Sequence, residues 1–204
     1  MGNPLLDEYS ENMPKILLRP DHLSSNDKDS IIIGLLPGSR KAEIKNLLDV
    51  MIKAANLIYQ RNKKINFIIS KASSIKREVL ETQFKKNRTD FIFQITEGPV
   101  KDIFLKSDLV IAASGTVTLE AALCCVPTII VYKMSAVSYW MAKLFIKVKY
   151  VGLANLIVNA EVMPELLQND ATPEKISKKA LYMLDNLSYF KKKLQMVRKL
   201  LGKK

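Results

Sequence analysis

Two short turns in this sequence have residue types that suit a phosphate group. The first is the run Pro37-Gly38-Ser39-Arg40, which separates an apolar stretch from an amphipathic one. Its glycine lets the backbone turn and lets a ligand approach closely. Amides at the start of the following helix attract an anion, and the guanidinium of Arg40 matches phosphate oxygens. Taken alone, the run fits an ordinary strand-to-helix turn with a solvated arginine equally well.

The second turn has small and hydroxylated residues. Ser114, Gly115 and Thr116 follow another apolar stretch, and Glu120 comes one helical turn later. Amides at a helix start form an anion cradle, and a nearby carboxylate can accept two hydrogen bonds from a ribose diol. The alternative is a helix cap followed by an ordinary first-turn acid. The two turns together predict a nucleoside diphosphate site better than either does alone.

Apolar stretches of strand length alternate with helical patterns through the middle of the chain. Each is apolar throughout, which is typical of strands buried on both faces of a parallel sheet. The expected strands are 31–36, 65–69, 91–95, 109–113 and 128–132, and the expected helices are 44–58, 74–84, 100–105 and 117–124. This alternation predicts an α/β fold, a Rossmann-like doubly wound parallel sheet. Ligands bind beyond the carboxyl ends of such strands, where both turns lie.

The two ends of the chain differ from its middle. Residues 1–30 hold prolines and a polar run, which is typical of a connector. After Tyr132 we expect a helix over 136–146, one from Thr172-Pro173-Glu174 to about 186, and a basic amphipathic tail over 189–204. We therefore predict three parts, namely a connector over 1–30, a Rossmann-like domain over 31–170 and C-terminal helices over 171–204.

Charge and rare residues narrow the classes of function. The chain has 204 residues with 32 Lys and Arg against 20 Asp and Glu, a net charge of +12. Such a surface attracts phosphates, anionic lipid or nucleic acid, or simply carries solvated lysines. Cys124 and Cys125 are adjacent in an apolar run, which indicates buried thiols in a reducing compartment. With His22 as the single histidine, we expect no histidine-rich metal site, no Ser-His-Asp triad and no cofactor.

Several blocks of the sequence resemble the lipid-A-disaccharide synthases. They are the two turns, the blocks 132–135, 148–151 and 162–168, and Asn155-Leu156-Ile157. Each block is modest alone, but the combination is specific and extends over about residues 1–190. The resemblance implies a GT-B glycosyltransferase in which this chain is the carboxyl-terminal half, with 31–170 as the domain that binds the UDP-sugar.

The resemblance also implies a reaction and the residues that bind its donor. Such enzymes transfer 2,3-diacylglucosamine from UDP to 2,3-diacylglucosamine 1-phosphate, forming the β-1',6 lipid A disaccharide with inversion and releasing UDP. In that picture the residues that contact UDP are Gly38, Ser39, Arg40, Ser114, Gly115, Thr116, Glu120 and Asn155. Glu120 holds the ribose, Asn155 lines the donor cleft, and Arg40 with the helix dipoles stabilises the leaving UDP without a metal.

The sequence departs from that family pattern at its beginning. The resemblance implies an amino-terminal domain, and with it the carboxylate expected as general base, that we do not find among these residues, so we assign no catalytic residue here. Asn3 stands where histidine is usual, and Ala160 where a basic residue is common. We expect a fragment, a product of a split gene with a separate amino-terminal half, or a truncated relative that only binds UDP. A homodimer is a further possibility.

One stretch mixes aromatic, aliphatic and basic residues in a way that suits a bilayer surface. It includes Tyr139, Trp140, Lys143, Phe145 and Lys147. Apolar bodies enter the acyl boundary while amines stay at the headgroups, and the basic tail adds attraction to anionic lipid. We therefore expect a cytoplasmic protein bound peripherally at the inner face of the cytoplasmic membrane. A core helix whose lysines reach water is the alternative.

Two other functions stay open from the sequence. One is another GT-B enzyme acting on UDP-sugars, such as a murein-pathway transferase or a UDP-sugar epimerase. The other is a basic nucleic-acid-binding protein, which the charge permits. The aromatics form no evident stacking platform and no common nucleic-acid motif occurs, so we expect no nucleic-acid partner.

Overall fold

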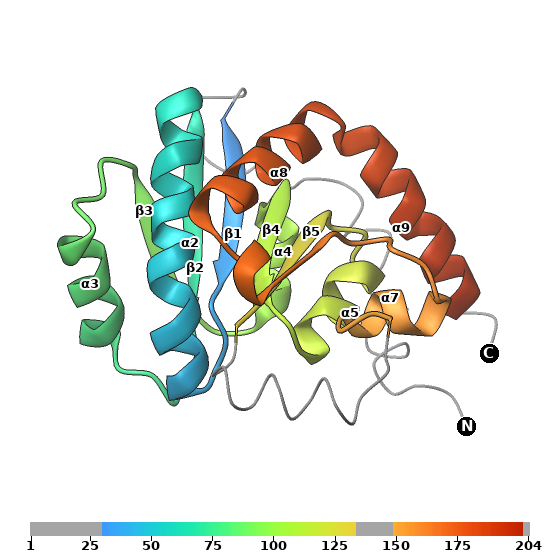
Figure 1. Ribbon diagram of the computed structural model, residues 1–204, viewed down its shortest axis with the longest axis horizontal. Coiled ribbons are helices and arrows are strands. Elements are labelled where there is room, and N and C mark those ends of the chain that lie inside the picture. Colours follow the sequence, from blue (N-terminus) through green and yellow to red (C-terminus); the bar gives the residue numbers. More distant parts are fainter. Residues whose placement is uncertain (1–29, 134–148, 202–204) are drawn as a thin grey trace.

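A parallel β-sheet forms the centre of the molecule. The computed structural model describes residues 30–133 and 149–201, and Figure 1 shows their arrangement. The sheet has six strands in the order β3-β2-β1-β4-β5-β6, and every neighbouring pair is parallel. The strands are β1 (Ile31–Leu36), β2 (Ile65–Lys71), β3 (Phe93–Glu97), β4 (Leu109–Ala113), β5 (Thr128–Tyr132) and β6 (Glu165–Leu167). The predicted doubly wound parallel sheet is confirmed.

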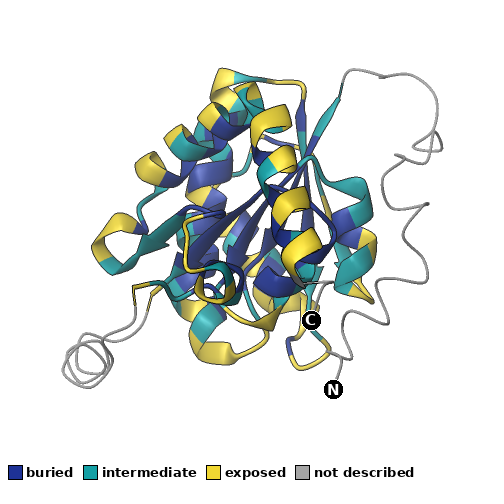
Figure 2. Cartoon of the chain, turned by 90° about the vertical axis from the view of Figure 1, so that its right-hand side faces the viewer, coloured by how far each residue is buried: buried dark blue, intermediate teal, exposed yellow. Residues whose placement is uncertain are grey.

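Helices cover both faces of the sheet and leave the strands buried (Figure 2). One face carries α2 (Lys41–Arg61), α3 (Arg77–Lys86) and α8 (Pro173–Asp185), and the other carries α4 (Val100–Lys106), α5 (Thr116–Leu123) and α7 (Leu153–Val158). Successive strand residues point to opposite faces, so Ile33 joins the first core and Ile32 the second. The last helix, α9 (Leu187–Leu201), places Phe190 in the first core and Leu194 in the second.

Helix α2 fixes the position of the first turn. Its buried residues recur at helical spacing, and they are the predicted stripe with Ala54 in addition: Ile44, Leu47, Leu48, Met51, Ile52, Ala54, Ala55 and Ile58. Full burial of one such Leu or Ile side chain is worth about 1.5–3 kcal/mol, so this stripe holds the helix firmly on the sheet. The amino-terminal end of α2 therefore stays at the carboxyl end of β1.

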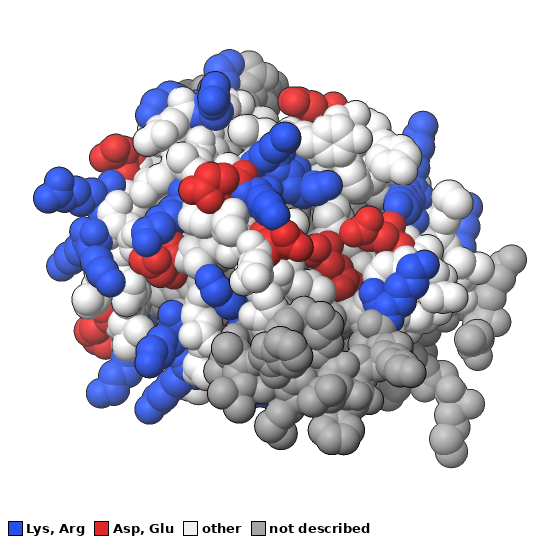
Figure 3. Space-filling view, viewed as in Figure 1, with Lys and Arg blue, Asp and Glu red and all other residues white. Residues whose placement is uncertain are grey.

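Charges of both signs share the face formed by α2, α3 and α8. Figure 3 shows Asp and Glu side chains lying among the Lys and Arg side chains on this face. Ion pairs on this face include Lys53 with Asp49, Arg77 with Glu81 and Lys175 with Asp170. The net charge of +12 therefore does not gather here as one basic patch.

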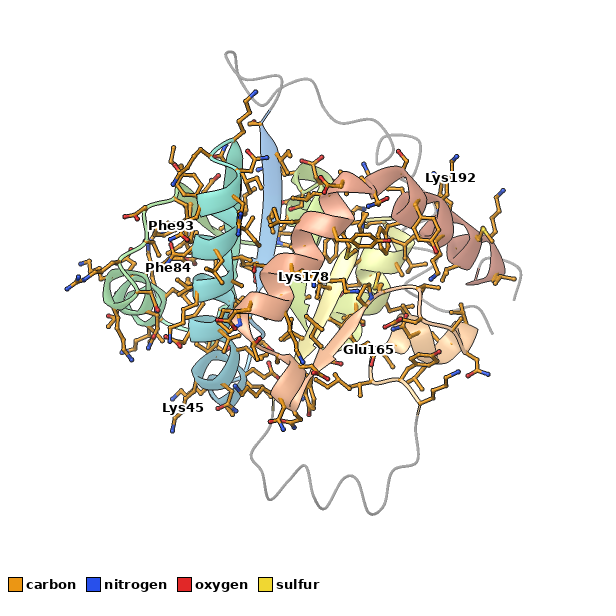
Figure 4. All side chains as sticks on the ribbon, turned by 45° about the horizontal axis from the view of Figure 1, so that its top comes forward. Lys45, Phe84, Phe93, Glu165, Lys178 and Lys192 are labelled. Atoms are coloured by element: carbon orange, nitrogen blue, oxygen red, sulfur yellow. The ribbon has the colours of Figure 1, made fainter. Side chains whose placement is uncertain are left out.

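The third strand lies two residues later than predicted. The cause is an aromatic cluster: Phe91 is buried beside Phe67, with ring centroids 4.5 Å apart, before the strand begins. Ile92 is exposed, and Phe93 stacks on Phe84 at 4.0 Å (Figure 4). An apolar run of this length satisfies either placement, and only packing against α3 selects one.

The region after β5 contains elements that the sequence did not predict. Helix α7, strand β6 and the single turn η2 (Gln168–Asp170) lie between β5 and α8, and none of them was predicted. The predicted cap of α8 is confirmed, because the Thr172 hydroxyl accepts a hydrogen bond from the Lys175 amide and Pro173 opens the helix. The predicted helix 136–146 lies outside the described residues. In the described ranges, no helix is long and apolar enough to cross a bilayer.

Candidate functional site

The strand order reverses between β1 and β4, and this switch point brings the two predicted turns together. β1 and β4 are neighbours although β2 and β3 lie between them in sequence. Leu36 and Ala112, near the carboxyl ends of these strands, are in register. The connections after the two strands leave in opposite directions, which opens a crevice where such sheets bind ligands.

A cavity of about 570 Å³ lies at this switch point. Seven predicted binding residues line it: Gly38, Ser39, Arg40, Ser114, Gly115, Thr116 and Glu120. Its volume lies in the range of small-molecule sites, about 300–1,000 Å³. A second hollow of about 760 Å³ lies between α3 and the edge strand β3, and none of the predicted residues lines it. The strand-end cavity is therefore the candidate site.

The first turn is held by a carboxylate that sequence reasoning missed. Glu43 Oε2 accepts hydrogen bonds from the amides of Ser39, at 3.0 Å, and Arg40, at 3.2 Å. Its Oε1 pairs with Arg40 Nη1 at 3.4 Å, while the Arg40 side chain stays 84% exposed. Glu43 is the third residue of α2, which is the position of the acidic residue in a capping box. This position is the signal from which the sequence could have identified Glu43. The amides predicted to bind phosphate thus carry an internal anion in this structure.

The loop that follows β2 also stabilises the first turn. The Ser74 hydroxyl donates to the Ser39 carbonyl at 2.7 Å. Lys71, the last residue of β2, donates from Nζ to the Ile75 carbonyl at 2.9 Å and pairs with Glu97 Oε2 at 3.3 Å. Its side chain is only 9% exposed, and it lines the cavity. We did not single out Lys71 from the sequence, because nothing local distinguishes it from the other lysines.

The second turn is built from the backbone of β4 and the first turn of α5. The Ser114 amide donates to the Val131 carbonyl at 3.1 Å, which fixes the end of β4 beside β5. The Thr118 hydroxyl, fully buried, donates to the Gly115 carbonyl at 2.8 Å. Glu120 is half-buried and faces the cavity from the second turn of the helix. Arg40 and Glu120 therefore share one cavity on the same side of the sheet edge.

Asn155 has a different place from the one predicted. Its side chain is fully buried and does not line the cavity. Its amide nitrogen donates to the Met163 carbonyl and to Glu165 Oε1, each at 2.7 Å. Its oxygen accepts from the amides of Val162, at 2.8 Å, and Met163, at 2.9 Å. Burial with every polar atom occupied gives Asn155 a positioning role in place of the predicted cleft-lining one.

Asn155 positions its surroundings through Glu165, which lies on β6 (Figure 4). The Glu165 carboxylate accepts hydrogen bonds from the amides of Val151, at 2.8 Å, and Gly152, at 2.9 Å. Val151 lines the cavity, and its carbonyl accepts a hydrogen bond from the Ser114 hydroxyl at 3.4 Å. A buried network thus holds the start of α7 against the second turn.

The cysteines supply no reactive thiolate to this site. Both are buried, as predicted. Burial raises the pKa of Cys124 to about 12, and it raises the pKa of Cys125 in spite of a hydrogen bond from Arg198 that lowers it. Within residues 30–133 and 149–201, no three His, Cys, Asp or Glu side chains gather as a metal site would need.

Tyr139, Trp140, Lys143, Phe145 and Lys147 all lie outside the described residues.

The whole chain, residues 1–204, matches the family model described as lipid-A-disaccharide synthetase. Among curated relatives, it is 43% identical over 152 residues to the lipid-A-disaccharide synthase of Nitrosococcus oceani, covering 74% of this chain and 39% of that protein. It is 35% identical over 218 residues to that of a Sulfurihydrogenibium species, covering 100% of this chain and 55% of that protein. The chain therefore spans about half the length of such relatives, or less.

Solved structures with a similar architecture include a glycosyltransferase and a complex with UDP. WaaG, a glycosyltransferase involved in lipopolysaccharide biosynthesis, aligns with a TM-score of 0.62 at 13% identity, covering 98% of this chain and 48% of that one. The S. aureus MnaA–UDP co-structure aligns with a TM-score of 0.61 at 17% identity, covering 95% and 46%. At these identities the likeness shows the fold alone.

Proposed function

Because this chain belongs to the lipid-A-disaccharide synthase family, we propose that it is the donor-binding half of such a glycosyltransferase. It binds the UDP group of UDP-2,3-diacylglucosamine in the cavity at the β1–β4 switch point. The complete reaction transfers the sugar to 2,3-diacylglucosamine 1-phosphate, forms the β-1',6 linkage and releases UDP. The observation that carries this proposal is that both predicted turns and Glu120 line one cavity.

The residues of the cavity have distinct tasks in this proposal. The amino-terminal ends of α2 and α5 converge on the diphosphate, so their dipoles favour its negative charge. Arg40 is exposed, and in the described part of the chain its guanidinium pairs with Glu43, so it turns onto the phosphates without losing a buried contact. Glu120 accepts hydrogen bonds from the ribose. Charge that develops on UDP as the glycosidic bond breaks is stabilised by these fixed groups, while the general base comes from outside this chain.

Calorimetric titration with UDP tests the proposal directly. We expect saturable binding that Arg40→Ala and Glu120→Ala each weaken by about 10- to 100-fold, since each change removes hydrogen bonds to a charged group. Arg61→Ala and Glu78→Ala are matched controls, because both residues are exposed and neither lines the cavity. A calorimetric titration that shows no UDP binding to the folded wild-type protein would refute the proposal.

Donor choice separates this function from other UDP-sugar enzymes. We expect UDP-2,3-diacylglucosamine to displace UDP more effectively than UDP-N-acetylglucosamine does. Activity on 2,3-diacylglucosamine 1-phosphate is expected only when an amino-terminal half supplies the base. Equal displacement by acylated and unacylated donors, with turnover of the unacylated one, would favour a different UDP-sugar enzyme.

We also propose that the protein binds peripherally at the inner face of the cytoplasmic membrane. Support comes from the net charge of +12 and from the mixed stretch around Trp140 and Phe145. The test is sedimentation with vesicles: binding is expected to anionic and not to neutral vesicles, and Trp140→Ala with Phe145→Ala is expected to reduce it. Recovery of the wild-type protein in the supernatant with anionic vesicles would contradict this.

A further inference from the structure

The cavity contains a buried cation, Lys71, to which the proposed function gives no role. The Lys71 side chain is 9% exposed at the carboxyl end of β2, and it lines the cavity together with both turns. Burying an ammonium group costs free energy unless it is paired and hydrogen-bonded. Lys71 has two partners, the Ile75 carbonyl at 2.9 Å and Glu97 Oε2 at 3.3 Å.

These two partners differ in how firmly they are held. The Ile75 carbonyl is part of the loop backbone, and the Ile75 side chain is buried in the core. Glu97 ends the edge strand β3, and its side chain is 56% exposed. A solvated carboxylate can turn toward water at little cost, because exposed ion pairs are worth only about 0–1 kcal/mol. Lys71 is thus a fixed cation with a replaceable counterion.

The balance of charge in the cavity lining shows what Lys71 contributes to a site for a diphosphate. Among the described residues that line the cavity, Arg40 and Lys71 are cationic, whereas Glu43 and Glu120 are anionic. Glu43 already pairs with Arg40. Without Lys71 the lining would have an excess of negative charge, which would repel a diphosphate.

From this geometry we propose that Lys71 is a further donor-binding residue, whose ammonium exchanges Glu97 for a diphosphate oxygen when the nucleotide binds. The inference rests on the proposed function, since it assigns a contact within that same cavity. No covalent bond changes in this exchange. The carboxylate of Glu97 moves into water as the phosphate takes its place.

Counterion exchange predicts effects of opposite sign from the two partners. Lys71→Gln keeps a donor for the Ile75 carbonyl but removes the charge, so it should weaken UDP binding by about tenfold or more. Glu97→Gln removes the competitor and should tighten UDP binding by about two- to fivefold. An ion pair that only stabilises the fold would give no gain from Glu97→Gln.

The experiment is calorimetric titration of the full chain and its variants with UDP and, by competition, with uridine. Uridine lacks phosphates, so neither substitution should change its affinity. Glu81→Gln is the matched control for Glu97→Gln, because Glu81 is also an exposed carboxylate in an ion pair, with Arg77 at 2.8 Å, and does not line this cavity. Lys71→Arg keeps the charge and should retain most UDP affinity, and thermal unfolding shows whether each variant is folded.

Each outcome bears on one proposal. If the wild-type chain does not bind UDP, the proposed function itself fails. If it does bind UDP and Lys71→Gln binds equally well, only the inference about Lys71 fails. Equal losses for UDP and uridine would mean that Lys71 acts through the loop and would overturn the exchange. Should Lys71→Gln not fold, Glu97→Gln decides alone, because the absence of any gain in UDP affinity contradicts the exchange.

Discussion

Gly38 and Gly115 both line the cavity, but the space around them differs. Gly38 has φ +104°, and a Cβ there would lie 2.2 Å from Glu43 Oε2. Gly115 has extended backbone, and a Cβ there would meet nothing within 4 Å. The first glycine is needed for the turn itself, whereas the second leaves room for a ligand.

Alanine at these two positions should separate stability from binding. Gly38→Ala forces a side chain into a strained conformation and displaces Glu43, so we expect a loss of about 1–3 kcal/mol in the free energy of unfolding. Gly115→Ala should change that free energy by less than about 0.5 kcal/mol while weakening UDP binding, because its methyl group enters the cavity. Urea unfolding and UDP titration measure both effects. A Gly38→Ala protein as stable as wild type would contradict the geometry of the turn.

The buried thiols give a second prediction at the residue scale. Because burial raises the pKa of Cys124 to about 12 from 9.0, almost none of the Cys124 side chain is thiolate in the native protein at pH 8, and burial raises the pKa of Cys125 as well. We expect slow reaction with Ellman's reagent in the native state and rapid reaction of both cysteines in guanidinium. The raised pKa also stabilises the fold fully below about pH 9, and this contribution is lost as pH rises toward 12. Rapid native labelling at pH 8 would show that the thiols are accessible.

At the scale of elements, α7 and β6 are joined by polar groups where the other elements rely on apolar packing. Asn155 and Glu165 together occupy the amides of Val151, Gly152 and Val162 and the backbone of Met163. A three-residue strand and a six-residue helix bury little apolar surface of their own. The network therefore determines where the start of α7 lies against the second turn.

Removal of Asn155 should accordingly cost more than removal of an exposed cap. Asn155→Ala leaves buried amides without acceptors, so we expect a loss of about 2–3 kcal/mol in the free energy of unfolding. Thr172→Ala, which removes only the cap of α8, should cost about 1 kcal/mol and serves as the comparison. Both values come from denaturant unfolding. Equal losses from the two variants would mean that the network contributes little.

At the scale of the whole molecule, the last two helices complete both cores. α8 contributes Ile176, Ala180 and Met183 to one face, and α9 contributes Leu194 and Val197 to the other. α8 packs directly on α2, the helix that carries the first turn. The C-terminal helices are therefore part of the packing that holds the site.

A chain that ends at residue 170 should consequently lose cooperative folding. Its sheet would expose apolar surface on both faces, more than a marginally stable domain can tolerate. We expect no cooperative thermal transition by circular dichroism and no UDP binding. Lys178→Ala and Lys192→Ala on the exposed sides of the same helices should leave the transition temperature unchanged. A shortened chain that still melts cooperatively would show that residues 171–204 form a dispensable unit.

Local patterns in the sequence were sufficient for most of the fold. Five apolar runs predicted five of the strands, the stripe from Ile44 to Ile58 predicted α2, and Thr172-Pro173 predicted the start of α8. Each of these signals is a periodicity or a helix cap within a few residues, so it can be recognised without knowledge of the fold. The two turns were also found this way, and the parallel sheet then placed them at one edge.

Only the tertiary structure decided which polar residues share the site and which support it. Strand β6 is too short to have a periodicity, and its Glu165 is meaningful only beside α7. Lys71 lines the cavity because β2 lies next to β1, whereas Asn155 does not line it because its side chain is buried against the backbone of Met163 and against Glu165. Burial and pairing depend on which elements pack against one another, and no local pattern records that.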